Sequence, residues 1–364
     1  MNKLAVMFAV LTAGAGAQTF SHRIDLGTDS PVALLSEDFS NSATAARGGT
    51  YMVDVRAALS LRNTTQRKIR AVTLVVYAQE VAPGGKGSVS VSSLNVAPGE
   101  AFKVNIAVPL LRPLGPTNPS GPTVEVKLDS VLFDDLTFFG PDTLKSQHAM
   151  LRWEMEARRD RKHFKTLLET AGAEGLRKEM VAGLARQDDR RRPGAQMARG
   201  RSTNTEAERE MKFAFVDIPE SPVEALSGSA RVALNEARAP RISVRNRSPR
   251  PVDHVEIGWI VRDQLGREFL AASMPADLKL DPNQSGDVRQ EGALRLQDTM
   301  PIQTMTGFVS SVSFADGTVW IPSRSALAIP RLREILPPSP EEQRLLQLYT
   351  KKGLDALIEE LKKF

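Results

Sequence analysis

The chain has 364 residues but no cysteine, only four histidines, and aromatic residues at 5% of its length. The missing cysteines exclude a thiol nucleophile, disulfide stapling and the lipid attachment of a bacterial lipoprotein. The histidines (His22, His148, His163 and His254) match no metal-binding spacing, and no serine elbow, phosphate loop or dinucleotide glycine motif occurs. We therefore expect no catalytic, cofactor-binding or metal-binding residue, no cofactor, and no enzyme.

Two near-matches to metal sites leave alternatives open. His254 stands two residues before Glu256 on an expected strand, so the two side chains share a face. A half-built metal site is one interpretation, and a histidine at the edge of a core, which we favour, is the other. Residues Asp281–Asp287 resemble the start of a calcium loop, but the twelfth position is Gly292 instead of glutamate. An ordinary turn between strands is the preferred interpretation.

Long apolar runs are also missing, since none approaches the roughly 20 residues of a membrane span. The first residues still have three features of a signal peptide in the right order: Lys3, the apolar stretch Leu4–Leu11, and Ala15-Gly16-Ala17 before Gln18. We expect residues 1–17 to be removed on export, which leaves a periplasmic or secreted protein whose mature chain has no transmembrane span.

The net charge of +5 is a modest excess, gathered at Arg190–Arg192 and along Arg158–Lys165. In an exported protein this pattern favours anionic envelope polymers or lipid head groups as partners, and not nucleic acid. A solvated helix face with internal pairs such as Glu154 with Arg158 is the plainer alternative.

What the chain does contain is an internal duplication. Leu59–Tyr77 matches Ile242–Ile260, with Asn63 opposite Asn246, and Ser130–Pro141 matches Ser311–Pro322 without a gap. Ala171–Met180 matches Lys352–Leu361 at the same separation of 181 residues (311 − 130 and 352 − 171). Several matches in the same order indicate a tandem repeat.

Each repeat has strand patterns followed by helical patterns. Val72, Leu74 and Val76 alternate with their neighbours, as do Val255, Ile257 and Trp259, which is typical of strands with one buried face. Helical spacing of Met150, Trp153, Ala157, Phe164 and Leu168 predicts a helix up to about Gly172, and Ser339-Pro340-Glu341-Glu342 predicts a capped helix start.

The repeated closing hairpin contains acidic residues, which makes it a candidate site. Asp316-Gly317 between apolar runs predicts a type I′ turn. Asp135-Leu136 fits such a turn poorly, which predicts a longer or different loop in the first repeat. Asp134 and Asp135 are adjacent on a strand and point to opposite faces, so they cannot form a paired-carboxylate site.

These patterns predict a mainly β fold with helical additions: two tandem antiparallel immunoglobulin-like β-sandwiches, each followed by a helical hairpin. We expect each hairpin to pack within its own repeat. The expected boundaries are a signal peptide (1–17), sandwich 1 (18–142), hairpin 1 (143–186), a flexible basic linker (187–210), sandwich 2 (211–330) and a C-terminal hairpin (331–364).

The Asn63-Thr64-Thr65 and Asn246-Arg247-Ser248 turns, the aliphatic strands after them and the hairpin ending at Trp320 resemble immunoglobulin-like modules of exported bacterial proteins. With Val131–Asp142 and Arg158–Lys165, the whole chain is similar to a family of uncharacterised exported bacterial proteins with duplicated modules of this kind. The resemblance implies a fold and a compartment, and it brings no catalytic residue.

Three functional hypotheses follow. The first is a non-catalytic protein-binding or assembly module of the envelope or secreted fraction, with another exported or envelope protein as its partner, bound along a sandwich edge or in a groove. The second is a binder of anionic polysaccharide or lipid head groups through the basic helix and linker. The third, an unrecognised enzyme, requires carboxylates or histidines that converge in a pocket.

Overall fold

The computed structural model describes residues 20–47, 50–78, 84–113, 123–189, 195–198, 207–289, 293–296 and 300–364. The expected signal peptide and the Arg190–Arg192 run lie outside the described residues. Strands account for 48% of the chain and helices for 25%, so the mainly β prediction is confirmed. The chain divides into two compact units, Met1–Ser146 and Gln147–Phe364.

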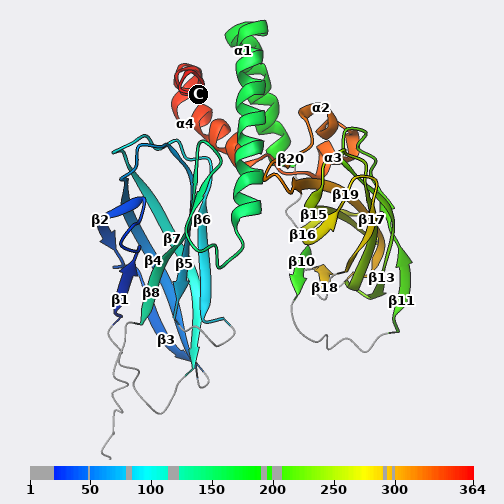
Figure 1. Ribbon diagram of the computed structural model, residues 1–364, viewed down its shortest axis with the longest axis horizontal. Coiled ribbons are helices and arrows are strands. Elements are labelled where there is room, and N and C mark those ends of the chain that lie inside the picture. The colour runs from blue at the N-terminus through cyan, green and yellow to red at the C-terminus, as the bar shows by residue number, and fades with distance from the viewer. Residues whose placement is uncertain are drawn as a thin grey trace, which may run out of the picture. The chain divides into compact units, whose positions relative to one another are not determined.

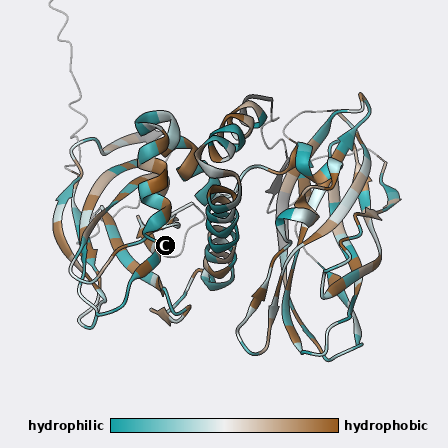
Figure 2. Cartoon of the chain, turned by 90° about the horizontal axis from the view of Figure 1, so that it is seen from above, coloured by the Kyte–Doolittle hydropathy of each residue, from teal (hydrophilic) through white to brown (hydrophobic). Residues whose placement is uncertain are grey.

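The first unit consists of two sheets that share one apolar core, to which Leu59, Leu74 and Val126 contribute fully buried side chains (Figure 1). One sheet has the order β1 (His22–Asp25), β8 (Val124–Phe133), β5 (Ile69–Tyr77), β6 (Lys86–Val91), with β9 (Phe138–Phe139) on β8. The other has the order β2 (Val32–Asp38), β4 (Thr50–Asn63), β3 (Ala43–Arg47), with β7 (Ala101–Pro113) on β4. Hydrophobic and hydrophilic residues alternate along many of the strands, as expected where one face is buried (Figure 2).

The strands of the second unit form one continuous sheet, in the order β11 (Arg209–Lys212), β13 (Val223–Ala233), β14 (Glu236–Asn246), β18 (Ala293–Leu296), β10 (Ala195–Ala198), β16 (Glu268–Leu280), β15 (Val252–Asp263), β19 (Ile302–Phe314), β12 (Ala214–Phe215). β17 (Ser285–Arg289) pairs with β14, and β20 (Val319–Trp320) pairs with β19. β10 lies within the segment that we expected to be a flexible linker. It pairs with both β16 and β18, so this part of the segment belongs to the sheet.

Two buried asparagines show that the repeats share structural detail. Asn63 and Asn246 are both 0% exposed. The Nδ2 of Asn63 lies 2.7 Å from the carbonyl oxygen of Arg67, and that of Asn246 lies 2.8 Å from the carbonyl oxygen of Arg250. Each also reaches two carbonyls of the turn beyond, at 3.1–3.2 Å, and each Oδ1 accepts the N–H of the residue two positions on. The side-chain amide therefore ties two turns together in each repeat.

The closing hairpins correct two expectations. In the second repeat the loop has three residues, closed by the Phe314 N–H on the Thr318 carbonyl, and Gly317 has φ +79° while Asp316 is not among the residues with positive φ. This is a three-residue loop and not a type I′ turn. The first repeat uses the same three-residue loop, with Leu136 at φ +66°. Its loop is longer than a two-residue turn, as expected, but the expected difference between the two repeats is wrong.

Asp316 is an exposed turn residue, as predicted, and it accepts the Thr318 N–H at 2.9 Å. Asp135 does the same for Thr137 at 3.0 Å. The hydroxyl of the same threonine also donates to each carboxylate at 2.6 Å, and this bond, together with the N–H bond, lowers the pKa of both carboxyls. An arginine crosses each hairpin and lies over a phenylalanine ring, at 3.6 Å from its centroid in both repeats. The hairpins are structural.

The calcium-like stretch is a turn followed by a strand, which confirms the preferred interpretation. The Asp281 N–H donates to Gln284 Oε1 at 2.8 Å, and Ala97 donates to Glu100 Oε2 at the same distance in the first repeat. Ser285–Arg289 is β17 and pairs with β14, so its alternate residues cannot surround an ion.

In the described part of the second unit, the helices are α1 (Gln147–Asp189), α2 (Arg324–Leu327), α3 (Pro330–Ile335) and α4 (Pro340–Lys362). Both α1 and α4 contain a break, at Gly172 (φ 66°, ψ −170°) and at Gly353 (φ 81°, ψ −176°). Only glycine adopts this backbone region readily. The Ser339 hydroxyl accepts the Glu342 N–H at 3.0 Å, which confirms the predicted helix cap. Within the described residues, none of these helices has the length and apolar content to cross a membrane.

The apolar faces of α1 and α4 pack on each other, and not each within its own repeat as we expected. Their shared core contains Phe164, Leu176 and Met180 from α1, and Leu345, Leu357 and Leu361 from α4. These are equivalent positions, since each α4 residue lies 181 residues after its α1 counterpart. The two repeats therefore contact each other through equivalent surfaces, as the subunits of a symmetric dimer do.

Candidate functional site

The second unit contains a groove of about 440 Å³ between α1, the strands β15, β16 and β19, and the segment before α4. This volume is in the range of sites that hold a ligand or a few side chains. Most of the lining is apolar, and includes Trp153, Leu270, Phe308, Leu327, Leu336 and Pro337.

Local sequence explains why the groove is open here. A Cβ on Gly258 would lie 2.2 Å from the ring of Phe308, so glycine leaves room for the end of that ring against β15. Pro337, Pro338 and Pro340 follow Leu336, whose backbone is extended (φ −72°, ψ 129°). Prolines keep this wall extended and remove main-chain donors from it.

Charged side chains at one side of the groove come from α1. Arg152 forms an ion pair with Glu256 of β15, and its Nε lies 3.9 Å from Glu156 Oε1. That Nε is buried and has no hydrogen-bond partner. Arg159 donates from Nη1 to the Pro322 carbonyl at 3.0 Å. The groove therefore combines an apolar floor with a guanidinium that has an unused donor.

Glu156 is the one acid that lines the groove, and burial raises the pKa of its carboxyl despite the nearby guanidinium of Arg152. Since this pKa is higher in the folded chain, the contribution of Glu156 to stability is fully present below the ordinary value of 4.5 and is lost as pH rises through the folded value. We expect Glu156→Gln to raise the melting temperature at about pH 7.5 and to change it little at about pH 4. Thermal unfolding at both pH values measures this. A melting temperature that falls at the higher pH contradicts it.

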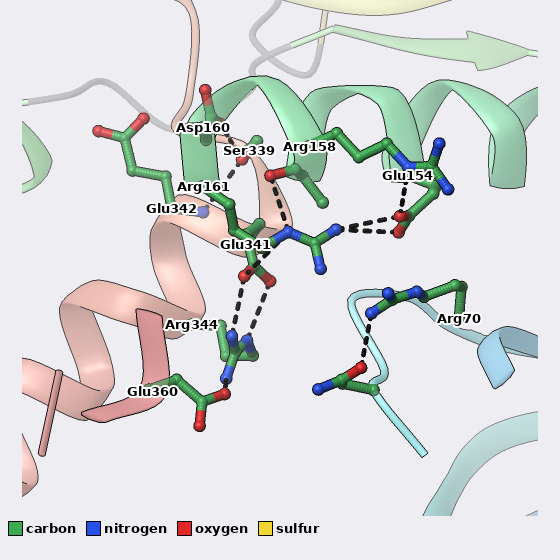
Figure 3. Close-up of polar contacts among 12 residues, drawn as sticks. Arg70, Glu154, Arg158, Asp160, Arg161, Ser339, Glu341, Glu342, Arg344 and Glu360 are labelled. Carbon is green, nitrogen blue, oxygen red and sulfur yellow. Dashed lines mark hydrogen bonds and ion pairs between the residues drawn. The ribbon is translucent and has the colours of Figure 1, made fainter. Parts of the chain in front are cut away.

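Behind the groove, a buried ion network joins α1 to α4 (Figure 3). The Ser339 hydroxyl donates to Asp160 Oδ2 at 2.6 Å, and Arg324 contacts Asp160 and Glu342 at 3.5 and 2.7 Å. Glu341 accepts two hydrogen bonds from Arg344, which also pairs with Glu360 at 2.6 Å. These bonds hold the start of α4, and with it one wall of the groove, against α1.

The same network occupies much of the basic surface that the sequence suggested. Arg161 is 4% exposed and donates to Glu154 at 3.1 Å. Arg158 pairs with Glu154 at 2.9 Å, which confirms the internal pair, and Arg159 pairs with Asp160. All three arginines in Arg158–Lys165 are thus engaged within the second unit.

The sequence did not indicate the groove, because its lining is mostly apolar and comes from stretches that are far apart in the chain.

The histidines have different surroundings. His22, in the first unit, stacks on Phe39 and lies 2.9 Å from Glu37. His163 lies beside Phe164 on α1. His148 and His254 stack on each other, with ring centroids 4.2 Å apart. His254 is 5% exposed, as expected for a core-edge residue.

No protein-family model matches the sequence, and no curated protein does. Solved structures with some similarity include a red sea bream transglutaminase (10% identity, 80% of this chain and 31% of that chain, TM-score 0.15). Another is a beta-glucosidase from Kluyveromyces marxianus (8% identity, 71% of this chain and 45% of that chain, TM-score 0.17). A third is a Bacteroides uniformis beta-glucuronidase (10% identity, 72% of this chain and 26% of that chain, TM-score 0.14). This chain spans less than half the length of each. Similarities at these TM-scores carry no argument about function.

Proposed function

We propose that the protein is a non-catalytic, exported binding module of the cell envelope or secreted fraction, built from two immunoglobulin-like sandwiches. Its groove in the second unit takes a short extended segment of another exported protein. The segment presents an apolar side chain to Leu270 and Leu336, and a carboxylate to the side of the groove that is lined by Arg152 and Arg159. The expected signal peptide supports the compartment.

The observation that carries this proposal is the groove itself, with its apolar lining and the two arginines, Arg152 and Arg159, at one side. A carboxylate is the natural partner for a guanidinium N–H, and its charge-assisted hydrogen bond is strong in a partly desolvated site. The groove is lined by one carboxylate, Glu156, so it offers no converging pair for acid–base chemistry. Binding is therefore favoured over catalysis.

Addition of a strand at the sandwich edges has less support. In the first unit the Leu111 N–H donates to the Gly84 carbonyl at 2.8 Å, which joins β7 to the start of β6. In the second unit β10 bridges β16 and β18. These contacts occupy part of the strand edges to which a peptide could add.

The second candidate, a binder of anionic polymer or lipid head groups, rests on Lys162, Lys165 and the linker arginines. This candidate predicts that the protein captures anionic polymer or lipid less strongly as salt screens the charges. The groove proposal predicts capture that persists in high salt, because most of its contact is apolar.

The test is affinity capture of the tagged protein from envelope and secreted fractions, followed by titration with a synthetic peptide from the captured partner. We expect Leu336→Asp to weaken peptide binding about tenfold or more, because it places a charge on the apolar lining. The control is Leu265→Asp, since Leu265 is 66% exposed and does not line the groove. Equal binding by both variants overturns the groove proposal. Loss of capture in high salt, with anionic polymer released, supports the second candidate instead.

A further inference from the structure

His148, His254 and Asp277 form a cluster at the start of α1 whose ligand atoms all lie within 4.8 Å of one another. The strands of the second unit bring it together. His254 on β15 is directly opposite Asp277 on β16 and Ser313 on β19, so the three side chains form a row across the sheet. His148, from α1, stacks on His254 with an angle of 6° between the rings.

Each imidazole is oriented by a neighbour. Asp277 Oδ1 lies 3.0 Å from His254 Nδ1, and Ser313 Oγ lies 3.1 Å from His148 Nδ1. Asp277 Oδ1 and His254 Nδ1 are therefore about as far apart as two ligands of one ion, and an ion that takes the place of the proton between them is bound by both. Metal binding by a histidine requires a deprotonated ring nitrogen, so it releases such a proton.

The register between α1 and β15 is fixed by a second row of contacts. One turn along α1, Arg152 pairs with Glu256, which lies two residues beyond His254 on the same face of β15. The Ser311 hydroxyl also donates to Glu256 Oε2 at 3.0 Å. Glu256, which the sequence suggested as a partner for His254 at a metal site, is thus engaged by Arg152 and Ser311. It helps to hold the two imidazoles in position.

We propose that this cluster binds a first-row divalent transition metal ion, with Zn²⁺ as the representative, through the imidazoles of His148 and His254 and the carboxylate of Asp277. Two nitrogen ligands and one oxygen ligand are a donor set that suits Zn²⁺ and Cu²⁺, and not Ca²⁺ or Mg²⁺. Around tetrahedral zinc the ligand atoms are about 3.3 Å apart, so modest side-chain rotations bring them to bonding distance.

Such an ion has a clear structural effect, because its ligands come from α1, β15 and β16. It fastens the start of α1 to the sheet, one turn before the residues that line the groove. The metal site therefore makes the position of this groove wall depend on the ion. The inference stands independently of what the groove binds.

The test is titration of the full chain, free of any histidine tag, with ZnCl₂ in a calorimeter. We expect one ion per chain and a higher melting temperature in its presence, because an ion that binds only the folded state stabilises it by mass action. His148→Gln is expected to weaken binding by at least 100-fold, and Asp277→Asn by about 10–100-fold. The matched control is His163→Gln, which changes a histidine of the same helix outside the cluster.

Two outcomes overturn the proposal. One is a chain with no saturable Zn²⁺ binding, or with binding that His148→Gln leaves unchanged. The other is a loss of binding that is equal in the His163→Gln variant. His254 is buried, so its replacement can unfold the sheet. Asp277, whose side chain is 69% exposed, gives the variant that keeps the fold. Its melting temperature without metal is expected to match that of the unmodified chain closely.

Discussion

Glu341→Ala is expected to destabilise the second unit by about 3–5 kcal/mol, because it removes one member of a buried ion network. Glu341 is 0% exposed, and its oxygens accept from Arg344 Nε at 2.9 Å and Nη2 at 2.8 Å. Arg161, itself buried, lies 3.8 Å from it. Burial lowers the pKa of Arg344, but its hydrogen bonds with Glu341 outweigh this and raise the pKa overall. Arg344 therefore stays charged when Glu341 is removed. It keeps Glu360 as its remaining acidic partner, and Arg161 keeps Glu154.

A matched control is available on α1. Glu174 pairs with Arg177 at 2.8 Å with the same spacing of three residues, but its side chain is 77% exposed. Glu174→Ala is expected to change stability by less than about 1 kcal/mol, since exposed pairs contribute little. Thermal and denaturant unfolding of both variants measures the difference. If the two variants have the same free energy of unfolding, the network contributes no more to stability than a surface pair, and the prediction is wrong.

Asn63→Ala and Asn246→Ala are each expected to cost on the order of 3 kcal/mol, because each removes the buried amide that joins two turns and leaves the N–H of Thr65 or Ser248 without its acceptor. The two variants act in different units, so hydrogen exchange is the appropriate measurement. Protection is expected to fall in β4 and β5 for Asn63→Ala, and in β14 and β15 for Asn246→Ala.

Asn105→Ala is the control, since Asn105 is an exposed residue on β7 of the first unit. Its substitution is expected to change stability by less than about 0.5 kcal/mol. Similar losses of protection for Asn105→Ala and Asn63→Ala would show that the turn amide has no special role.

Asn63-Thr64-Thr65 and Asn246-Arg247-Ser248 also have the N-x-S/T pattern of glycosylation motifs. Their geometry makes both motifs unusable in the folded chain, because the amide nitrogens are buried and hydrogen-bonded.

The features that sequence reasoning identified are those with local causes. The alternation of apolar and other residues in Val72–Val76 and Val255–Trp259 predicted buried strands, and Ser339 predicted a helix start. These predictions succeed because side-chain burial and capping act over a few residues. Self-comparison identified the repeat, and the structure shows the repeat in Asn63 and Asn246 down to individual hydrogen bonds.

The features that it missed depend on tertiary structure. Leu136 adopts a left-handed backbone that leucine disfavours, because the surrounding hairpin, with Arg67 over Phe133, fixes the loop. β10 joins the sheet through main-chain pairing, for which its polar surroundings in the sequence gave no signal. Both cases are tertiary structure overriding local preference.

The candidate sites are the features that are hardest to predict from the sequence. His148, His254 and Asp277 are spread over three elements, and they meet only because β15 pairs with β16 while α1 lies on β15. Metal motifs are recognised in sequences when their ligands share one helix or loop. The groove is harder still, since apolar residues in a sequence look the same whether they fill a core or line a pocket.

The packing of α1 on α4 has a consequence for how such a chain can originate and grow. Equivalent positions of the two repeats cover each other, so a chain with a single repeat would expose Phe164, Leu176 and Met180 unless a second molecule supplied the matching face. The duplication thus links covalently what two separate molecules would form as a homodimer. The same pairing favours an even number of repeats. A third repeat would add a helical hairpin whose apolar face has no partner, whereas a fourth would supply that partner.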